Sequence, residues 1–180
     1  MRAAAGALAL LATAATAGQL LLPPPPTVAP RPAPARAAPC TAPEYRQFDF
    51  WAGNWRVKNA DGSPAGRNSI APILSGCVLH ESWQGAKGFR GESYSLYDDD
   101  TGHWHQTWVD QAGNLLLLDG GLQGNAMVLQ GEHKKDGKVL GERITWTPLP
   151  DGRVHQQWDT LAEGQTWSVS FDGYYERQPR

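Results

Sequence analysis

The sequence predicts an all-β domain of antiparallel strands, either a sandwich or an up-and-down barrel. Two observations lead to this expectation. From residue 50 onward, apolar and polar residues alternate in short runs, which is the pattern of half-buried strands. Turn residues such as Asp61-Gly62 and Asp136-Gly137 interrupt this alternation at short intervals. Asp-Gly steps supply the positive φ that tight hairpin turns require.

About ten strands fit between these turns, after one short N-terminal helical turn. The helical turn is expected over residues 44–51, and no other segment has the periodicity of an amphipathic helix. The turns that separate the later strands include Gly120-Gly121 and Pro150–Gly152. The strands are predicted over residues 53–60, 66–75, 77–84, 91–98, 103–110, 114–119, 126–133, 139–147, 153–160 and 166–177.

The last predicted strand has the most regular alternation. Because side chains alternate between the two faces of a strand, one set of residues is expected to face inward. Arg177 lies at the end of that set, where a buried guanidinium requires a partner, and the indole of Trp55 is the expected one. The predicted inward residues are Trp167, Val169, Phe171, Gly173, Tyr175 and Arg177.

The first strand carries a motif that resembles a known family. Gly53-Asn54-Trp55, after a short aromatic turn, is similar to the G-x-W signature of lipocalins and their calycin relatives. The resemblance implies an antiparallel barrel in which the tryptophan closes one end and packs beneath an arginine from a late strand. It therefore implies an up-and-down barrel of about ten strands, with Gly53, Trp55 and Arg177 as a structural lock and FDFWAGNW as a plug instead of a recognition surface.

A second resemblance covers residues 45–177. The segments FDFWxGxW, GCVLHESW, WxQxWVD, RITWTPLPDG and TWxxxFDGxY occur in this order. They resemble a group of exported bacterial proteins of unknown function that are commonly described as lipocalin-like. This resemblance implies the fold and brings no catalytic residues with it.

The N-terminal residues have the features of a secretory signal peptide over residues 1–22. Met1-Arg2 gives a positive start, an uncharged apolar stretch follows, and Ala15-Thr16-Ala17 offers small residues for cleavage. An uncleaved membrane anchor over residues 3–22 is the alternative, although the stretch is richer in alanine than membrane spans usually are. We therefore expect an exported protein, periplasmic or extracellular, that meets a membrane only if this leader is retained.

The next segment, residues 23–43, holds nine of the 14 prolines and cannot form a packed core. It is expected to be an extended, disordered tether, which leaves residues 44–180 for the barrel domain. Three arginines and no acidic residue precede Glu44, so the net charge of −2 for the whole chain becomes about −5 for this domain. A mildly acidic domain without a basic stripe argues against nucleic acid as a partner.

The chain has two cysteines, Cys40 and Cys77. An even number in an exported protein favours one disulfide bond, which would pin the end of the tether to the domain. A catalytic or metal-binding cysteine pair is the alternative, and the lack of CxxC spacing argues against it.

Histidines form the first candidate metal site. His103 and His105 share one face of a strand, and His155 from another strand is a third ligand of the kind zinc requires. However, Trp104 and Trp108 occupy the opposite face of the first strand. If the tryptophans face inward, the histidines face solvent, and we predict no metal site.

Other cofactors and reactions find little support in the sequence. Haem held by a single histidine is an alternative, with His80, His133 and His155 as candidates, and none stands out. Asp98–Asp100 fits a polar hairpin turn better than a calcium loop. No G-x-S-x-G elbow is present. We therefore predict no cofactor and no catalytic residue, and favour a protein that is not an enzyme.

What remains is the barrel interior. Polar residues interleaved with tryptophans on inward faces require hydrogen-bond partners, which can be each other, water or a ligand. The leading hypothesis is therefore a cavity that binds a small apolar or amphipathic molecule without transforming it. The alternatives are a haem or metal protein or enzyme using the same cavity, and an envelope structural protein with a filled barrel. The candidate cavity residues are Glu81, Trp83, Trp104, Gln106, Trp108, Trp146, Gln156 and Trp158.

Overall fold

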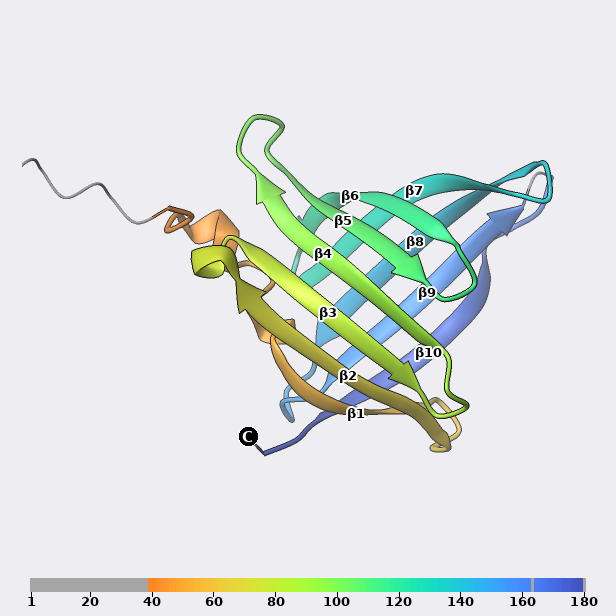
Figure 1. The fold of residues 1–180 in the computed structure, drawn as a ribbon, viewed down its shortest axis with the longest axis horizontal. Coiled ribbons are helices and arrows are strands. Elements are labelled where there is room, and N and C mark those ends of the chain that lie inside the picture. Colours follow the sequence, from red (N-terminus) through yellow and green to blue (C-terminus); the bar gives the residue numbers. More distant parts are fainter. Residues whose placement is uncertain (1–38, 163, 180) are drawn as a thin grey trace, which may run out of the picture. The chain divides into compact units, whose positions relative to one another are not determined.

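The computed structural model describes residues 39–162 and 164–179. The predicted signal peptide and most of the predicted tether lie outside these residues. The described residues form ten strands, with short 3-10 helices at the start of the domain and before β3 (Figure 1). The 3-10 helices are η1 (Pro43–Arg46), η2 (Asp49–Trp51) and η3 (Leu74–Gly76). The strands are β1 (Gly53–Asn59), β2 (Pro64–Ile73), β3 (Val78–Gly85), β4 (Arg90–Asp98), β5 (His103–Asp110), β6 (Leu115–Gln123), β7 (Ala126–Lys135), β8 (Lys138–Pro148), β9 (Val154–Ala162) and β10 (Ser168–Arg177).

The ten strands form one closed antiparallel barrel. Each strand pairs with its neighbours in sequence, and β1 closes the sheet by pairing with β10. In this closing pair Trp55 lies opposite Arg177, and Val57 lies opposite Tyr175. Closure leaves no unpaired sheet edge in the described part of the chain. The predicted fold class and the helical turn before the first strand are confirmed.

Two local features differ from the sequence-based expectation. Gly120-Gly121, expected as a turn, lies inside β6, and the chain turns after Gln123 instead. A Cβ atom at Gly120 would lie 2.1 Å from the carbonyl oxygen of Val128, so the glycine permits close approach of β7.

The second difference is in β10. Its register with β9 shifts between Val169 and Phe171, as in a β-bulge. The shift reverses the inward and outward assignment on its N-terminal side. Val169 is 58% exposed and Trp167 is 38% exposed, so the prediction that these two residues face inward is wrong.

The segment before β1 fills one end of the barrel interior. Phe48 and Trp51, here called the aromatic plug, are fully buried. Their rings stack with centroids 4.9 Å apart. The ring of Phe48 meets the ring of Trp104 edge-on at 5.6 Å, and Trp51 packs against Trp146 at 5.3 Å. The aromatic residues that open the domain are therefore a plug and not an exposed surface.

Arg177 and Trp55 join this plug to the wall. The guanidinium carbon of Arg177 lies 4.2 Å from the centre of the indole of Trp55. The same guanidinium donates hydrogen bonds to the carbonyl oxygens of Ala52 at 2.8 Å and Phe50 at 3.2 Å. A Cβ atom at Gly53 would lie 2.4 Å from Arg177 Nη1, and φ at this glycine is +146°. Unlike the expectation of a buried guanidinium, Arg177 is exposed at the barrel end, with one face covered by Trp55.

The predicted disulfide bond between Cys40 and Cys77 is confirmed, with 5.2 Å between the Cα atoms. It ties the residues before η1 to the start of β3. Arg46 reinforces this attachment by donating a hydrogen bond to the carbonyl oxygen of Gly76. A cross-link with a sequence separation of 37 residues contributes roughly 3–4 kcal/mol on the loop-entropy model.

Among the described residues, no helix has the length and apolar character needed to cross a bilayer.

The contact between Trp55 and Arg177 predicts non-additive mutations. Trp55→Ala removes a fully buried indole and is expected to lower the free energy of unfolding by about 3–5 kcal/mol. Arg177→Ala is expected to lower it by about 1–2 kcal/mol, because it removes the stacking and the carbonyl hydrogen bonds. Because both act through one contact, the double variant should lose less than the sum in urea denaturation.

The matched control for this cycle is Arg56→Ala, because Arg56 is exposed on the neighbouring outward position of β1. Its effect should stay within about 0.5 kcal/mol and should add to that of Trp55→Ala. Additive losses in the Trp55 and Arg177 cycle would show that the two side chains do not stabilise the barrel as a unit.

Candidate functional site

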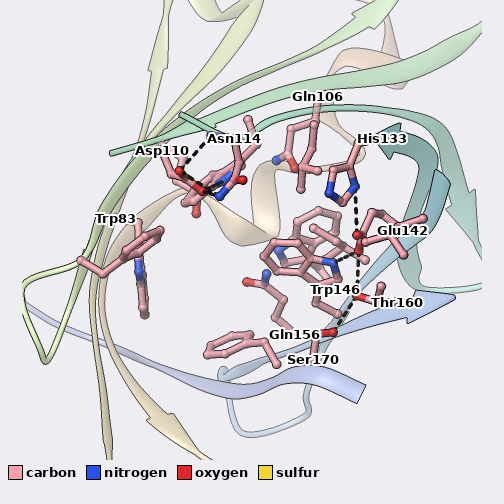
Figure 2. A pocket seen from close by; sticks show the side chains of 18 of the residues that line it. Trp83, Gln106, Asp110, Asn114, His133, Glu142, Trp146, Gln156, Thr160 and Ser170 are labelled. Atoms are coloured by element: carbon pink, nitrogen blue, oxygen red, sulfur yellow. Dashed lines mark hydrogen bonds and ion pairs between the residues drawn. The ribbon is translucent and has the colours of Figure 1, made fainter. Parts of the chain in front are cut away.

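The other half of the barrel interior holds a cavity of about 530 Å³. It lies beyond the aromatic plug, and its lining includes Asp110 and Asn114, which flank the β5–β6 turn (Figure 2), and Lys135 at the end of β7. Its volume is within the range of small-molecule sites in proteins. The lining residues are Glu81, Trp83, Phe89, Gln106, Trp108, Asp110, Asn114, Leu116, His133, Lys135, Leu140, Glu142, Ile144, Trp146, Gln156, Trp158, Thr160, Ser170, Phe171 and Tyr175.

Aromatic side chains form much of this lining. Trp146 separates the cavity from the plug, since it lines the cavity and also packs against Phe48 at 5.1 Å. Trp83 and Phe171 meet edge-on at 6.1 Å. A Cβ atom at Gly91 would lie 2.2 Å from the indole of Trp108, so this glycine makes room for the tryptophan against the wall. The cavity therefore offers a large apolar surface.

A buried hydrogen-bond network reaches the cavity from the wall of β2, β3 and β4. We call it the Glu81 network. Asn68 Nδ2 and Ser93 Oγ each donate to one carboxylate oxygen of Glu81 at 2.6 Å. Asn68 Nδ2 also lies 3.3 Å from the hydroxyl of Tyr175, which donates to Gln156 Oε1. Members of the network are Asn68, Glu81, Ser93, Ser95, Gln106, Gln156 and Tyr175.

Burial changes the ionisation of two members of this network. It raises the pKa of the Glu81 carboxyl above its usual range, and the hydrogen bonds from Ser93 and Asn68 counteract this only in part. Burial also raises the pKa of the Tyr175 hydroxyl well above 10, and the nearby Glu81 carboxyl adds to the increase. Tyr175 therefore acts as a neutral hydrogen-bond donor at neutral pH.

A second polar group lines the opposite part of the cavity. Glu142 accepts hydrogen bonds from Trp158 Nε1 and from Thr160 Oγ1, the latter at 3.0 Å. Thr160 Oγ1 is in turn 2.6 Å from Ser170 Oγ. His133 Nδ1 lies 3.1 Å from Glu142 Oε1, at an angle that does not make a hydrogen bond. Figure 2 shows this row of contacts running from His133 to Ser170.

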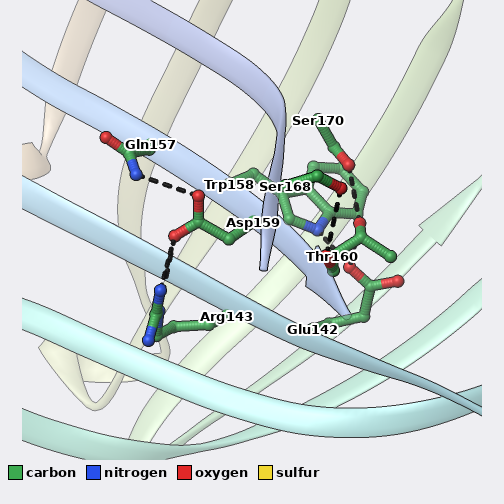
Figure 3. A network of polar contacts seen from close by, with 8 residues as sticks. All are labelled: Glu142, Arg143, Gln157, Trp158, Asp159, Thr160, Ser168 and Ser170. Carbon is green, nitrogen blue, oxygen red and sulfur yellow. Dashed lines mark hydrogen bonds and ion pairs between the residues drawn. The ribbon is translucent and has the colours of Figure 1, made fainter. Parts of the chain in front are cut away.

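The outer face of the same strands carries a separate ionic contact (Figure 3). Arg143 Nη2 is 3.0 Å from Asp159 Oδ2, and Gln157 Nε2 donates to Asp159 Oδ1 at 2.9 Å. The ring of Trp167 lies 4.4 Å from the guanidinium carbon of Arg143. This explains the position of Trp167, because stacking on an exterior guanidinium places the indole on the outer wall.

The other histidines lie on the outer face. His105 Nδ1 is 2.7 Å from Asp119, and His155 Nε2 is 2.7 Å from Asp172. His80 pairs with Glu92 at 3.0 Å, and His103 is exposed. Within residues 39–162 and 164–179, no group of three or more His, Cys, Asp or Glu residues is arranged to hold a metal ion.

The structure brings seven of the eight predicted cavity residues together around one space. They are Glu81, Trp83, Gln106, Trp108, Trp146, Gln156 and Trp158. Trp104 is not among the lining residues. It is 2% exposed, packs against the plug, and its Nε1 donates to Gln47 Oε1 at 3.1 Å. Trp104 belongs to the filled end because β5 crosses both halves of the barrel.

Sequence reasoning missed Glu142, Thr160 and Ser170 as cavity residues, and considered His133 only as a haem ligand. Alternation along β7 carries the signal, because Met127 and Leu129 share a face with His133. The same parity along β8 places Glu142 with Ile144 and Trp146. Asn68 and Ser93 were also missed, and their inward positions follow from alternation along β2 and β4.

No protein-family model matches the sequence, and no curated protein shows significant similarity to it.

The raised pKa of Glu81 predicts how stability changes with pH. The folded state holds the proton of the Glu81 carboxyl more tightly than the unfolded state does, so this proton stabilises the fold. The stabilisation is fully present below about pH 4.3, the usual pKa of a free glutamate. The contribution is then lost as pH rises through the folded-state pKa. Glu81→Gln cannot titrate, so the native protein should lose free energy of unfolding relative to this variant as pH rises from 4 to 9.

Urea denaturation across this pH range measures the difference. Glu132→Gln, at an exposed outward position of β7, is the control and should follow the native pH dependence. A constant difference between the native protein and Glu81→Gln across the range would contradict the prediction.

Proposed function

We propose that the protein is an exported, lipocalin-like barrel that binds a small apolar or amphipathic molecule without transforming it. The observation that supports this function most directly is the aromatic cavity of about 530 Å³ in one half of the barrel. Tryptophan and leucine side chains supply the apolar contact, and the Glu81 network supplies a few polar atoms. Apolar walls with a small number of placed polar groups are the usual composition of ligand sites.

The disulfide bond supports the exported location in this proposal. Disulfide bonds persist in oxidising compartments and are rare in the cytosol. Cys40 lies at the end of the predicted proline-rich tether, and its bond to Cys77 attaches that end to the domain. The predicted signal peptide is consistent with the same location.

A structural barrel with a filled interior fits the structure less well. Filling would require the wall side chains to occupy the half of the interior that the aromatic plug leaves free. The cavity also keeps polar atoms of Glu81, Gln106 and Gln156 at its surface. Such groups are expensive to bury unless water or a ligand completes their hydrogen bonds.

Filling the cavity tests the proposed function. Leu140 lines the cavity near the start of β8, and Leu140→Trp adds volume to that space. The added indole occupies space that a bound molecule would fill. We expect this variant to weaken the binding of a neutral fluorescent naphthalene derivative about tenfold or more, because the apolar contact that the fluorophore loses is worth more than about 1.4 kcal/mol of binding free energy. Fluorescence titration measures the change.

Leu117→Trp is the matched control, because Leu117 is 48% exposed on the outer face of β6. It should leave the dissociation constant unchanged. Equal affinity in Leu140→Trp and the native protein would place the fluorophore outside the cavity and count against the proposed function.

Haem binding is a second candidate, favoured by the position of one histidine. Of the three candidates His80, His133 and His155, only His133 lines the cavity. Its Nδ1 is turned toward Glu142, which leaves Nε2 as the ligand nitrogen, and a carboxylate beside the other ring nitrogen is common for metal-bound histidines. Under this candidate, hemin titration should give a stoichiometric Soret shift that His133→Ala abolishes and His80→Ala retains.

A further inference from the structure

The carboxylate of Glu81 faces the cavity without an ion-pair partner among the described residues. The residue is 5% exposed and belongs to the cavity lining. No lysine or arginine within the described ranges makes an ion pair with it. Buried carboxylates are normally paired with a cation or hold a proton. A ligand in the cavity can supply the missing cation.

The hydrogen bonds of the Glu81 network fix which atoms the cavity presents. An ionised carboxylate only accepts, so Ser93 donates to ionised Glu81 and accepts from Gln106 Nε2, which lies 3.3 Å away. Gln106 Nε2 also donates to Ser95 at 3.0 Å. The carbonyl oxygen of Gln106 is therefore left without a hydrogen bond from the described residues, as an acceptor at the cavity surface.

Glu81 has unused acceptor capacity as well. Each carboxylate oxygen receives one hydrogen bond, from Asn68 or from Ser93, and each can accept two. Glu81 and Gln106 thus offer several acceptors side by side, since Glu81 lies opposite Ser93 and Gln106 lies opposite Ser95. A group with several N–H donors and a positive charge is the complement of this arrangement.

The adjacent walls suit such a group. Trp83 follows Glu81 on the inward face of β3, and Trp108 follows Gln106 on the inward face of β5. Indole surfaces attract cations and also bury apolar chains. A molecule with a cationic end beside Glu81 can therefore extend its apolar part along both tryptophans.

The other charged groups of the cavity are already engaged or add negative charge. Asp110 accepts from Asn114 and from the backbone of Ala112. Glu142 is held by Trp158 and Thr160 and lies beside His133. Lys135 near the end of β7 is the remaining charged residue of the lining. Three carboxylates against one lysine disfavour an anionic ligand.

We propose that the ligand is an amphipathic primary amine, whose ammonium group donates hydrogen bonds to Glu81 and Gln106 while its apolar chain lies along Trp83 and Trp108. This inference rests on the proposed ligand-binding function and specifies its ligand class. Where Glu81 holds a proton in the free protein, the arriving ammonium replaces it and the proton leaves to solvent. Binding of the amine is then linked to the release of up to one proton.

Three probes of equal chain length test this proposal on the purified protein. Octylammonium, octanol and octanoate share the same apolar part and differ in the charge of the head group. At pH 7 we expect octylammonium to bind at least about tenfold more tightly than octanol, because charge-assisted hydrogen bonds exceed neutral ones. Octanoate should bind more weakly than octanol. Quenching of tryptophan fluorescence and titration calorimetry give the dissociation constants.

Two variants test whether Glu81 causes the tighter binding of octylammonium. Glu81→Gln keeps the size of the side chain and should remove the advantage of octylammonium over octanol. It should also abolish proton release measured in two buffers of different ionisation enthalpy. Glu132→Gln removes a carboxylate from an exposed outward position of β7 and should change neither property.

The results distinguish failure of the proposed ligand-binding function from failure of the amine inference. If none of the three probes binds, the proposed ligand-binding function fails together with this inference. If the probes bind the native protein without preference for octylammonium, or if Glu81→Gln keeps the preference, the amine inference alone is overturned.

Discussion

The structure depends on how the interior of a ten-stranded barrel is occupied. An eight-stranded barrel is just filled by the side chains of its own wall, and each added strand widens the interior. This chain fills one end by inserting Phe48 and Trp51 from the segment before β1. Trp146 covers the inner side of that plug, and the cavity begins at its other face. One end of the barrel is thus a packed core, and the other end encloses a cavity. The disulfide bond and Arg177 hold the plug in place.

The polar residues of the interior have a directional role that follows from one acceptor. Because a carboxylate accepts and does not donate, Glu81 determines which way Asn68 and Ser93 point their donors. The direction continues through Ser93 to Gln106, and through Asn68 and Tyr175 to Gln156. A buried network of this kind sets the orientation of side-chain amides that the wall itself would leave free to flip.

Alternation and turn residues were sufficient to predict the ten strands, the closed barrel and most of the cavity residues. They were insufficient where a local irregularity changes which residues of a strand face the barrel interior. The register shift in β10 turned Trp167 and Val169 outward, and nothing in the period-two pattern announces a bulge. Gly120-Gly121 has turn composition, but it lies inside β6, where Gly120 permits the close approach of β7.

Depth along the barrel is a further property that alternation does not report. Trp104 and Trp108 share the inward face of β5, yet Trp104 packs on the plug and Trp108 lines the cavity. Which residue falls on which side depends on where the N-terminal segment enters, and that is a tertiary contact. Alternation along β7 and β8 places His133 and Glu142 on inward faces. It does not indicate that these two side chains lie next to each other.

The pairing of β1 with β10 has a consequence for how the chain reaches its native state. Trp55 and Arg177 lie opposite each other although nearly the whole domain separates them in sequence. Contacts of such long range form slowly, because a long loop must close before any hydrogen bond compensates for the lost entropy. The barrel cannot close until its last strand is available. A chain that emerges from its N-terminus during synthesis therefore stays open until its C-terminal residues arrive.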